Sequence, residues 1–243
     1  MVLLSIVIPT KNEEKRLPEL LASLKRQTYP RIEIIVADAR STDRTRKCAT
    51  SVGARVVDGG MPGPGRNRGA EVATGDVIVF FDADVILPSD TYLAECVEEM
   101  ASRNLDIGTS KLYPFDGTRV DHVLHELYNR YVVMTAPVLA HAPGFCMFVR
   151  REVHERIHGF DEEVVFAEDM DYVRRASKLG YRFGIFQGQK IHVSARRLRK
   201  EGRAALVAKY VYAEARILVK GPFKSQTPFS YEFEHTEDKV EHV

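Results

Sequence analysis

Two aspartates, Asp82 and Asp84, directly follow the apolar run 77–81 and are well placed to do chemistry. An unbroken apolar run of this kind predicts a strand that is covered on both faces of a sheet. In open parallel sheets, ligands bind beyond the carboxyl ends of the strands. Two carboxylates one residue apart can hold a hard divalent cation and a sugar hydroxyl there. The alternative is a strand-end turn in which the aspartates accept hydrogen bonds from their own backbone.

Polar groups also follow the first two predicted strands. The first strand is followed by Pro9, Thr10, Lys11, Asn12 and Glu13. The second ends near Asp38, with Ser41, Thr42 and Asp43 behind it. Asp38 needs a donor partner in such a crevice, and the imide of a nucleobase supplies one. Glu13 and Asp43 can instead be helix-start acids that the helix dipole favours.

A glycine-rich segment, 63–69, contains Arg66 and Arg68 ahead of a predicted helix. A dinucleotide-binding fold requires its glycine-rich turn directly after the first strand, where this chain has none. We therefore interpret 63–69 as a flexible loop that brings both arginines towards a phosphate or ribose. Two solvated arginines at a helix start are the alternative.

Three acids, Glu168, Asp169 and Asp171, open a predicted helix that runs to Lys178 and ends at Gly180. Acids in a first helical turn offset the helix dipole. Taken alone, these residues favour that structural role.

The elements that must position these groups alternate between strand and helix. Apolar runs predict strands at 4–8, 32–36, 55–57 and 77–81, and helical spacing predicts helices between them and after 89. The alternation predicts a layered α/β domain with a mostly parallel sheet and right-handed crossovers.

The second half of the chain is less regular. We predict a strand at 107–112, a helix at 120–134 and a strand at 181–186. The proline-broken apolar stretch 136–149 is interpreted as a wall of a substrate site. Tyr128 and Tyr131 belong either to an acceptor pocket or to the core.

Composition excludes several classes of protein. The 243 residues are 44% hydrophobic and 28% charged, which excludes a wholly disordered chain or a coiled coil. The net charge of +1 lacks the excess typical of nucleic-acid binding. Three cysteines without a Cys-x-x-Cys pair argue against a disulfide framework or zinc ribbon. With no signal peptide or apolar run of membrane-spanning length recognised, we expect a cytoplasmic protein.

Charge is segregated along the chain. Residues 190–220 contain nine Lys or Arg and two acids, and a helix over 203–219 would be amphipathic. This pattern predicts contact with an anionic membrane surface or a lipid phosphate, and so peripheral attachment to the cytoplasmic membrane face. The alternative is a solvated helix packed on the catalytic domain.

Several spaced motifs resemble the family 2 glycosyltransferases, which have a GT-A fold. The motifs are Ser5 to Glu13, Val36 to Thr45, Arg66-Asn67-x-Gly69, Ala73-x-Gly75-Asp76, Asp82-Ala83-Asp84, Gly159 to Glu162, and Glu168 to Tyr172 with Arg175 and Gly180. The match spans about residues 3–195, with Ala39 and Arg40 where the family more often has an acid and a glycine.

The resemblance implies a nucleotide-sugar site and a metal site. The expected nucleotide-sugar contacts are Pro9, Thr10, Asn12, Glu13, Asp38, Arg66, Asp82, Ala83 and Asp84. By this resemblance Asp38 accepts from the base, Asp82 touches ribose or metal, and Asp84 binds Mn²⁺ or Mg²⁺ on the diphosphate. Related enzymes sometimes supply a third metal ligand after the 181–186 strand, which makes His192 a candidate. A packed or surface histidine is the alternative.

The resemblance also implies the chemistry. Asp169, with Glu168 as the second candidate, would be the general base that activates an acceptor hydroxyl, with inversion at the anomeric carbon. The donor would be a UDP- or GDP-sugar, and the acceptor a saccharide or a lipid-linked group. No nucleic-acid partner is expected.

We therefore predict a metal-dependent GT-A glycosyltransferase domain over 1–220, with a tail at 221–243. Within it, 1–110 would bind the nucleotide sugar, 111–195 the acceptor, and 196–220 would form the basic helix. A sugar nucleotidyltransferase is the alternative enzyme, but it needs a glycine-rich basic turn after the first strand. A catalytically inactive nucleotide-binding module is the other alternative; loss of Asp84 or Asp169 would favour it, and both are present.

Overall fold

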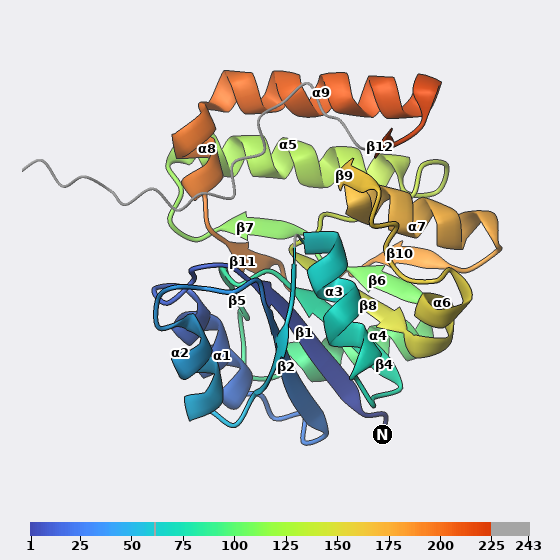
Figure 1. Cartoon of the computed structure of the whole chain (residues 1–243). Coiled ribbons are helices and arrows are strands. Elements are labelled where there is room, and N and C mark those ends of the chain that lie inside the picture. The colour runs from blue at the N-terminus through green and yellow to red at the C-terminus, as the bar shows by residue number, and fades with distance from the viewer. Residues whose placement is uncertain (61, 225–243) are drawn as a thin grey trace, which may run out of the picture.

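A seven-stranded sheet forms the centre of the protein in the computed structural model, which describes residues 1–60 and 62–224 (Figure 1). In spatial order the strands are β10 (Phe183–Ile185), β6 (Ile107–Thr109), β8 (Cys146–Arg150), β4 (Val77–Phe81), β1 (Leu4–Thr10), β2 (Ile32–Asp38) and β3 (Arg55–Asp58). Only β8 runs antiparallel to its neighbours in this sheet. The predicted layered α/β fold with a mostly parallel sheet is confirmed.

The strand register brings the predicted site segments to one edge. Pro9 of β1 lies opposite Ala37 of β2, and Thr10 lies opposite Asp38. Strand β4 pairs with the other side of β1 in the same direction. The carboxyl ends of β1, β2 and β4 therefore meet at one edge of the sheet, as the sequence predicted.

Helices cover both faces of this sheet. Successive side chains of β1 point to opposite faces, so the strand contributes to a hydrophobic core on each side. Ile6 and Ile8 pack in one core, and Val7 packs in the other. The first core includes side chains of α1 (Leu17–Lys25), α2 (Thr45–Ser51) and α4 (Tyr92–Ser102). The second includes side chains of α3 (Pro62–Glu71), α6 (Arg151–Arg156) and α7 (Glu168–Lys178).

Smaller elements lie beyond the carboxyl edge of the sheet. A three-stranded sheet has the order β5 (Val85–Ile86), β11 (Ile191–Val193) and β7 (Leu112–Pro114), and β9 (Val164–Phe166) pairs with β12 (Phe223–Lys224). Three helices complete this end: α5 (Arg119–Thr135), α8 (Arg196–Glu201) and α9 (Arg203–Lys220). Figure 1 shows α5 and α9 running along this end of the molecule.

Two predicted elements differ from the structure. The segment 107–112, expected to form one strand, contributes to β6 and β7, which belong to different sheets. The stretch 136–149, expected to line a substrate site, ends in the buried strand β8, which pairs with both β4 and β6. Only its first part, up to Phe145, lies outside the sheet.

The glycine-rich segment 63–69 is not a flexible loop, because it lies within α3. Prolines at 62 and 64 fit the first turn of a helix, where a backbone N–H has no helical acceptor. Gly69 allows α3 to pack closely on β1, since a Cβ there would lie 2.3 Å from Val7 Cγ1. These glycines and prolines therefore serve packing and helix initiation.

Candidate active site

Arg66 is at the centre of the candidate site. Its side chain extends from α3 and is only 3% exposed. The guanidinium donates to Asp82 Oδ1 over 2.9 Å and to Glu168 Oε1 over 2.7 Å. Its Cζ also lies 5.3 Å from the centre of the Phe160 ring. One buried arginine thus joins the strand-end aspartate to the start of α7.

Arg66 and the carboxylates around it shift each other's pKa values. Burial raises the pKa of Asp82 to about 6; Arg66 opposes this shift, and the charges of Asp84 and Glu168 add to it. The surrounding carboxylates raise the pKa of Arg66 although burial acts in the opposite direction. The guanidinium therefore stays charged and allows the carboxylates to gather. Arg68, the other arginine of the segment, is half exposed and pairs with Glu71 over 3.0 Å.

A second arginine, Arg196 of α8, contacts the other aspartate of the pair. Its Nε lies 3.1 Å from Asp84 Oδ2, and its Nη2 lies 2.8 Å from Glu13 Oε1. Burial raises the pKa of Asp84, and Arg196 opposes that shift. Ala83, between the two aspartates, is buried in the core. Sequence reasoning counted Arg196 only within the basic segment 190–220, and no strand was predicted at 191–193 that would bring it to this site.

Asp38, predicted to contact a nucleobase, is fully buried at the end of β2. Its carboxylate accepts hydrogen bonds from the Ser41 N–H over 2.9 Å and from the Thr10 hydroxyl over 3.1 Å. Asn12 Oδ1 accepts from the N–H of Thr42 over 2.9 Å. The two predicted nucleotide-binding segments are thus bonded to each other, and the protein itself supplies donors to Asp38.

Asp169, the predicted base, lies beside Glu168 in the first turn of α7. Burial and the charge of Glu168 raise the pKa of Asp169 to about 6, whereas Arg66 opposes this. Asp169 Oδ1 accepts a hydrogen bond from the Met170 N–H over 2.9 Å. The residue before the helix, Ala167, has a left-handed backbone conformation with φ +57°.

Gly144 makes room for this cluster. A Cβ at this position would lie 3.0 Å from Arg66 Nη2 and 3.1 Å from Asp169 Oδ2. Asp171 is directed elsewhere, because its carboxylate pairs with Arg175 over 2.6 Å. The structure therefore gathers Asp82, Glu168 and Asp169 near Arg66 and assigns Asp171 to an ion pair within α7.

His192 lies on β11. Its neighbours Ile191 and Val193 are buried in the core, so alternation along the strand turns His192 to the opposite face. There its ring centre is 5.1 Å from that of Tyr113. No group of three or more His, Cys, Asp or Glu side chains arranged to hold a metal ion is found within residues 1–60 and 62–224.

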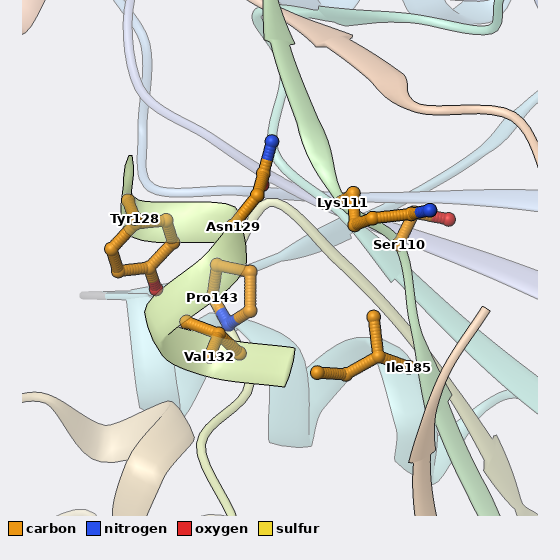
Figure 2. A pocket seen from close by; sticks show the side chains of 7 residues that line it. All are labelled: Ser110, Lys111, Tyr128, Asn129, Val132, Pro143 and Ile185. Atoms are coloured by element: carbon orange, nitrogen blue, oxygen red, sulfur yellow. The ribbon is translucent and has the colours of Figure 1, made fainter. Parts of the chain in front are cut away.

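Tyr128 of α5 lines a small hollow, together with Val132 and Pro143 (Figure 2). Its hydroxyl lies 2.9 Å from His141 Nε2, and His141 Nδ1 lies 3.2 Å from Glu214 Oε2 of α9. These contacts tie α5 and α9 to the loop that carries Gly144. Sequence reasoning assigned no role to His141, because a lone histidine in an apolar stretch has no distinguishing spacing.

Comparison with known proteins gives a consistent result. A family model described as "Glycosyl transferase family 2" matches residues 5–158. A 4,4'-diaponeurosporenoate glycosyltransferase of Staphylococcus haemolyticus is 33% identical over 140 residues, which are 54% of this chain and 35% of that protein. The uncharacterized glycosyltransferase EpsJ of Bacillus subtilis is 32% identical over 191 residues, which are 70% of this chain and 54% of EpsJ. The chain thus spans about a third to a half of these relatives.

Solved structures share the fold. The mannosyltransferase PcManGT of Pyrobaculum calidifontis has a TM-score of 0.67 and 22% identity, over 87% of this chain and 64% of that one. TarS of S. aureus, residues 1–349, has a TM-score of 0.63 and 23% identity, over 79% of this chain and 60% of that one. Both have the GT-A fold.

Proposed function

We propose that this chain, which belongs to glycosyltransferase family 2, transfers a sugar from a nucleotide diphosphate donor to an acceptor hydroxyl or lipid phosphate with inversion. The family, the enzyme class and the GT-A fold predicted from the sequence are confirmed. The observation that best supports the proposed reaction is the bridge made by Arg66. It holds the strand-end carboxylate Asp82 and the start of α7 within one charged cluster.

Solved neighbours support a nucleotide-sugar donor. PcManGT was crystallised with GDP-Man and Mn²⁺, and TarS with UDP-GlcNAc. In our proposal the segments ending β1, β2 and β4 bind the donor, and the start of α7 faces the acceptor. This corresponds to a donor half at 1–110 and an acceptor half at 111–195 of a domain over 1–220. Cytoplasmic location remains a prediction.

Asp169 is the general base in this proposal. It would take the proton of the acceptor hydroxyl as that oxygen attacks the anomeric carbon opposite the leaving diphosphate. Glu168 is a less suitable base, because its carboxylate is engaged by Arg66 over 2.7 Å. We assign Glu168 the role of holding Arg66 beside Asp82.

The pKa of Asp169 sets the expected pH dependence. Since this pKa is raised to about 6, the base is protonated and inactive below that pH. We expect kcat/KM for the acceptor to rise about tenfold per pH unit below about pH 6 and to level off above it. Initial rates at saturating donor test this. A profile that stays flat across this pH range in a folded enzyme would contradict the assignment of the base.

Asp82 and Asp84 fit a divalent cation by the chemistry of their donor atoms. Carboxylate oxygens suit Mg²⁺ and Mn²⁺, and Mg²⁺ is commonly held by one or two carboxylates together with substrate phosphates. A bound cation would stabilise the negative charge on the leaving diphosphate. His192 remains a prediction for a third ligand.

If Asp82 and Asp84 hold a cation, binding of a nucleoside diphosphate should depend on that cation. Binding of UDP or GDP should be much tighter in Mn²⁺ than in chelator, and Asp84→Ala should remove that difference. Isothermal titration calorimetry checks both, with Asp90→Ala as a control because Asp90 is an exposed aspartate paired with Arg26. Equal diphosphate affinity of the unmodified protein in Mn²⁺ and in chelator would refute the metal role.

A further inference from the structure

Helix α9 packs on the protein with much of its polar side turned inward. The side chains of Lys209 and Glu214 are only 10% and 15% exposed, and they pair with Glu201 and Arg174, each over 2.9 Å. Leu206, Ala213 and Ile217 fill the remaining contact with the body of the protein. The charged groups of this helix therefore serve its packing.

The outer side of α9 is apolar. From 204 to 219, every exposed residue is Ala, Val, Leu or Tyr. Val211 is 64% exposed and Leu218 is 57% exposed. An amphipathic helix on a folded domain normally shows the opposite arrangement, with its apolar stripe against the core.

Helix α5 extends this apolar surface. Its exposed apolar residues recur with helical spacing along one side: Val120, Val123, Leu127, Tyr131 and Met134. Arg203 at the start of α9 pairs with Asp121 of α5 over 2.7 Å, and Leu124 packs against Leu206 and its neighbours. The two helices thus lie side by side, as Figure 1 shows.

Basic residues stand at both ends of this surface. Arg119 and Lys200 are exposed near the starts of α5 and α9, and Lys220 is exposed at the end of α9. Apolar side chains flanked by Lys and Arg are the pattern of helices that lie in the interface of an anionic bilayer. If two copies of the chain paired symmetrically through this surface, the basic residues at its ends would face basic residues of the other copy.

We propose that α5 and α9 form a docking surface for a lipid bilayer with anionic headgroups, with both helices lying in the plane of the membrane. No helix within residues 1–60 and 62–224 is long and apolar enough to span a bilayer. The structure also changes the expected share of electrostatic attraction in membrane attachment. Several basic residues of 190–220 are engaged in ion pairs within the protein, among them Arg196, Arg199, Arg203 and Lys209. In this proposal, burial of the apolar side chains therefore contributes more to membrane attachment than the basic residues of 190–220 do.

Sedimentation of the full chain with vesicles tests the proposal. The probes are vesicles of phosphatidylcholine alone and of phosphatidylcholine with phosphatidylglycerol. We expect binding to the anionic vesicles, weakened but not abolished when about 1 M salt shortens the screening length to about 3 Å. Leu218→Glu should weaken binding about tenfold or more, since burying one leucine can change affinity by that factor.

Leu179→Glu is the matched control, because Leu179 is also 57% exposed but lies at the end of α7. It should bind like the unmodified chain, and thermal unfolding should show that both variants are folded. No sedimentation of the unmodified chain with anionic vesicles at low salt would overturn the proposal. So would equal binding by Leu218→Glu and Leu179→Glu. A dimer in light scattering that Leu218→Glu dissociates would assign the surface to a second copy instead. None of these outcomes depends on the transfer reaction.

Discussion

Asp169→Asn should lower kcat by roughly 10²- to 10⁴-fold, the usual contribution of a general base. Asparagine keeps the size of the side chain and its hydrogen bond from the Met170 N–H, but it cannot take a proton. The affinity for donor and cation should stay close to that of the unmodified enzyme. The loss should therefore appear in kcat and not in KM for the donor.

Asp171→Asn is the control for this experiment. It makes the same chemical change two residues further along the same helix, but at a carboxylate that pairs with Arg175. We expect its kcat to be near normal. If a folded Asp169→Asn enzyme also turned over at a near-normal rate, Asp169 would have no role as the base, and Glu168 would become the candidate.

Arg66→Met should lower the free energy of unfolding by about 3–5 kcal/mol, the usual cost of removing one partner from a buried ion pair. Methionine fills part of the space but leaves Asp82 and Glu168 without the charge they share. Denaturant unfolding measures the difference. Arg68→Met, two residues along the same helix, should cost no more than about 1 kcal/mol, because Arg68 is half exposed.

The pH dependence of this variant separates charge from packing. If unpaired carboxylates cause the instability, protonating them in mild acid should recover part of the lost stability relative to the unmodified protein. A loss that stays constant with pH would indicate lost packing of the arginine side chain. A total loss below about 1 kcal/mol at neutral pH would contradict the bridging role of Arg66.

The first half of the fold was predictable because its signals are local. Apolar runs and helical spacing predicted the strands β1 to β4, and the site segments followed from where those strands end. Strand β8 was missed for a different reason. Its pairing with β4 and β6 joins segments far apart in the chain, and its residues continue an apolar run that has no strand-specific spacing.

The sequence identified most of the candidate site residues, but it did not predict which side chains contact one another. The burial of Arg66 depends on two carboxylates, Asp82 and Glu168, that are distant in sequence, so the pattern around 63–69 indicated a flexible loop that carries both arginines towards a phosphate or ribose. The sequence also did not predict which side of α9 packs on the domain. An amphipathic pattern defines two faces of a helix, but it does not say which face contacts the domain when ion pairs such as Glu214–Arg174 favour the polar one.

The left-handed conformation of Ala167 links strand β12 to the backbone that carries Glu168 and Asp169. For a residue with a Cβ this conformation costs about 1–2 kcal/mol, and it persists only where the surroundings enforce it. Phe166, the preceding residue, pairs with Phe223 of β12 and packs with Ile217 of α9. Contacts with β12 and α9 thus support the strained backbone just before Glu168 and Asp169, although β12 lies more than fifty residues further along the chain.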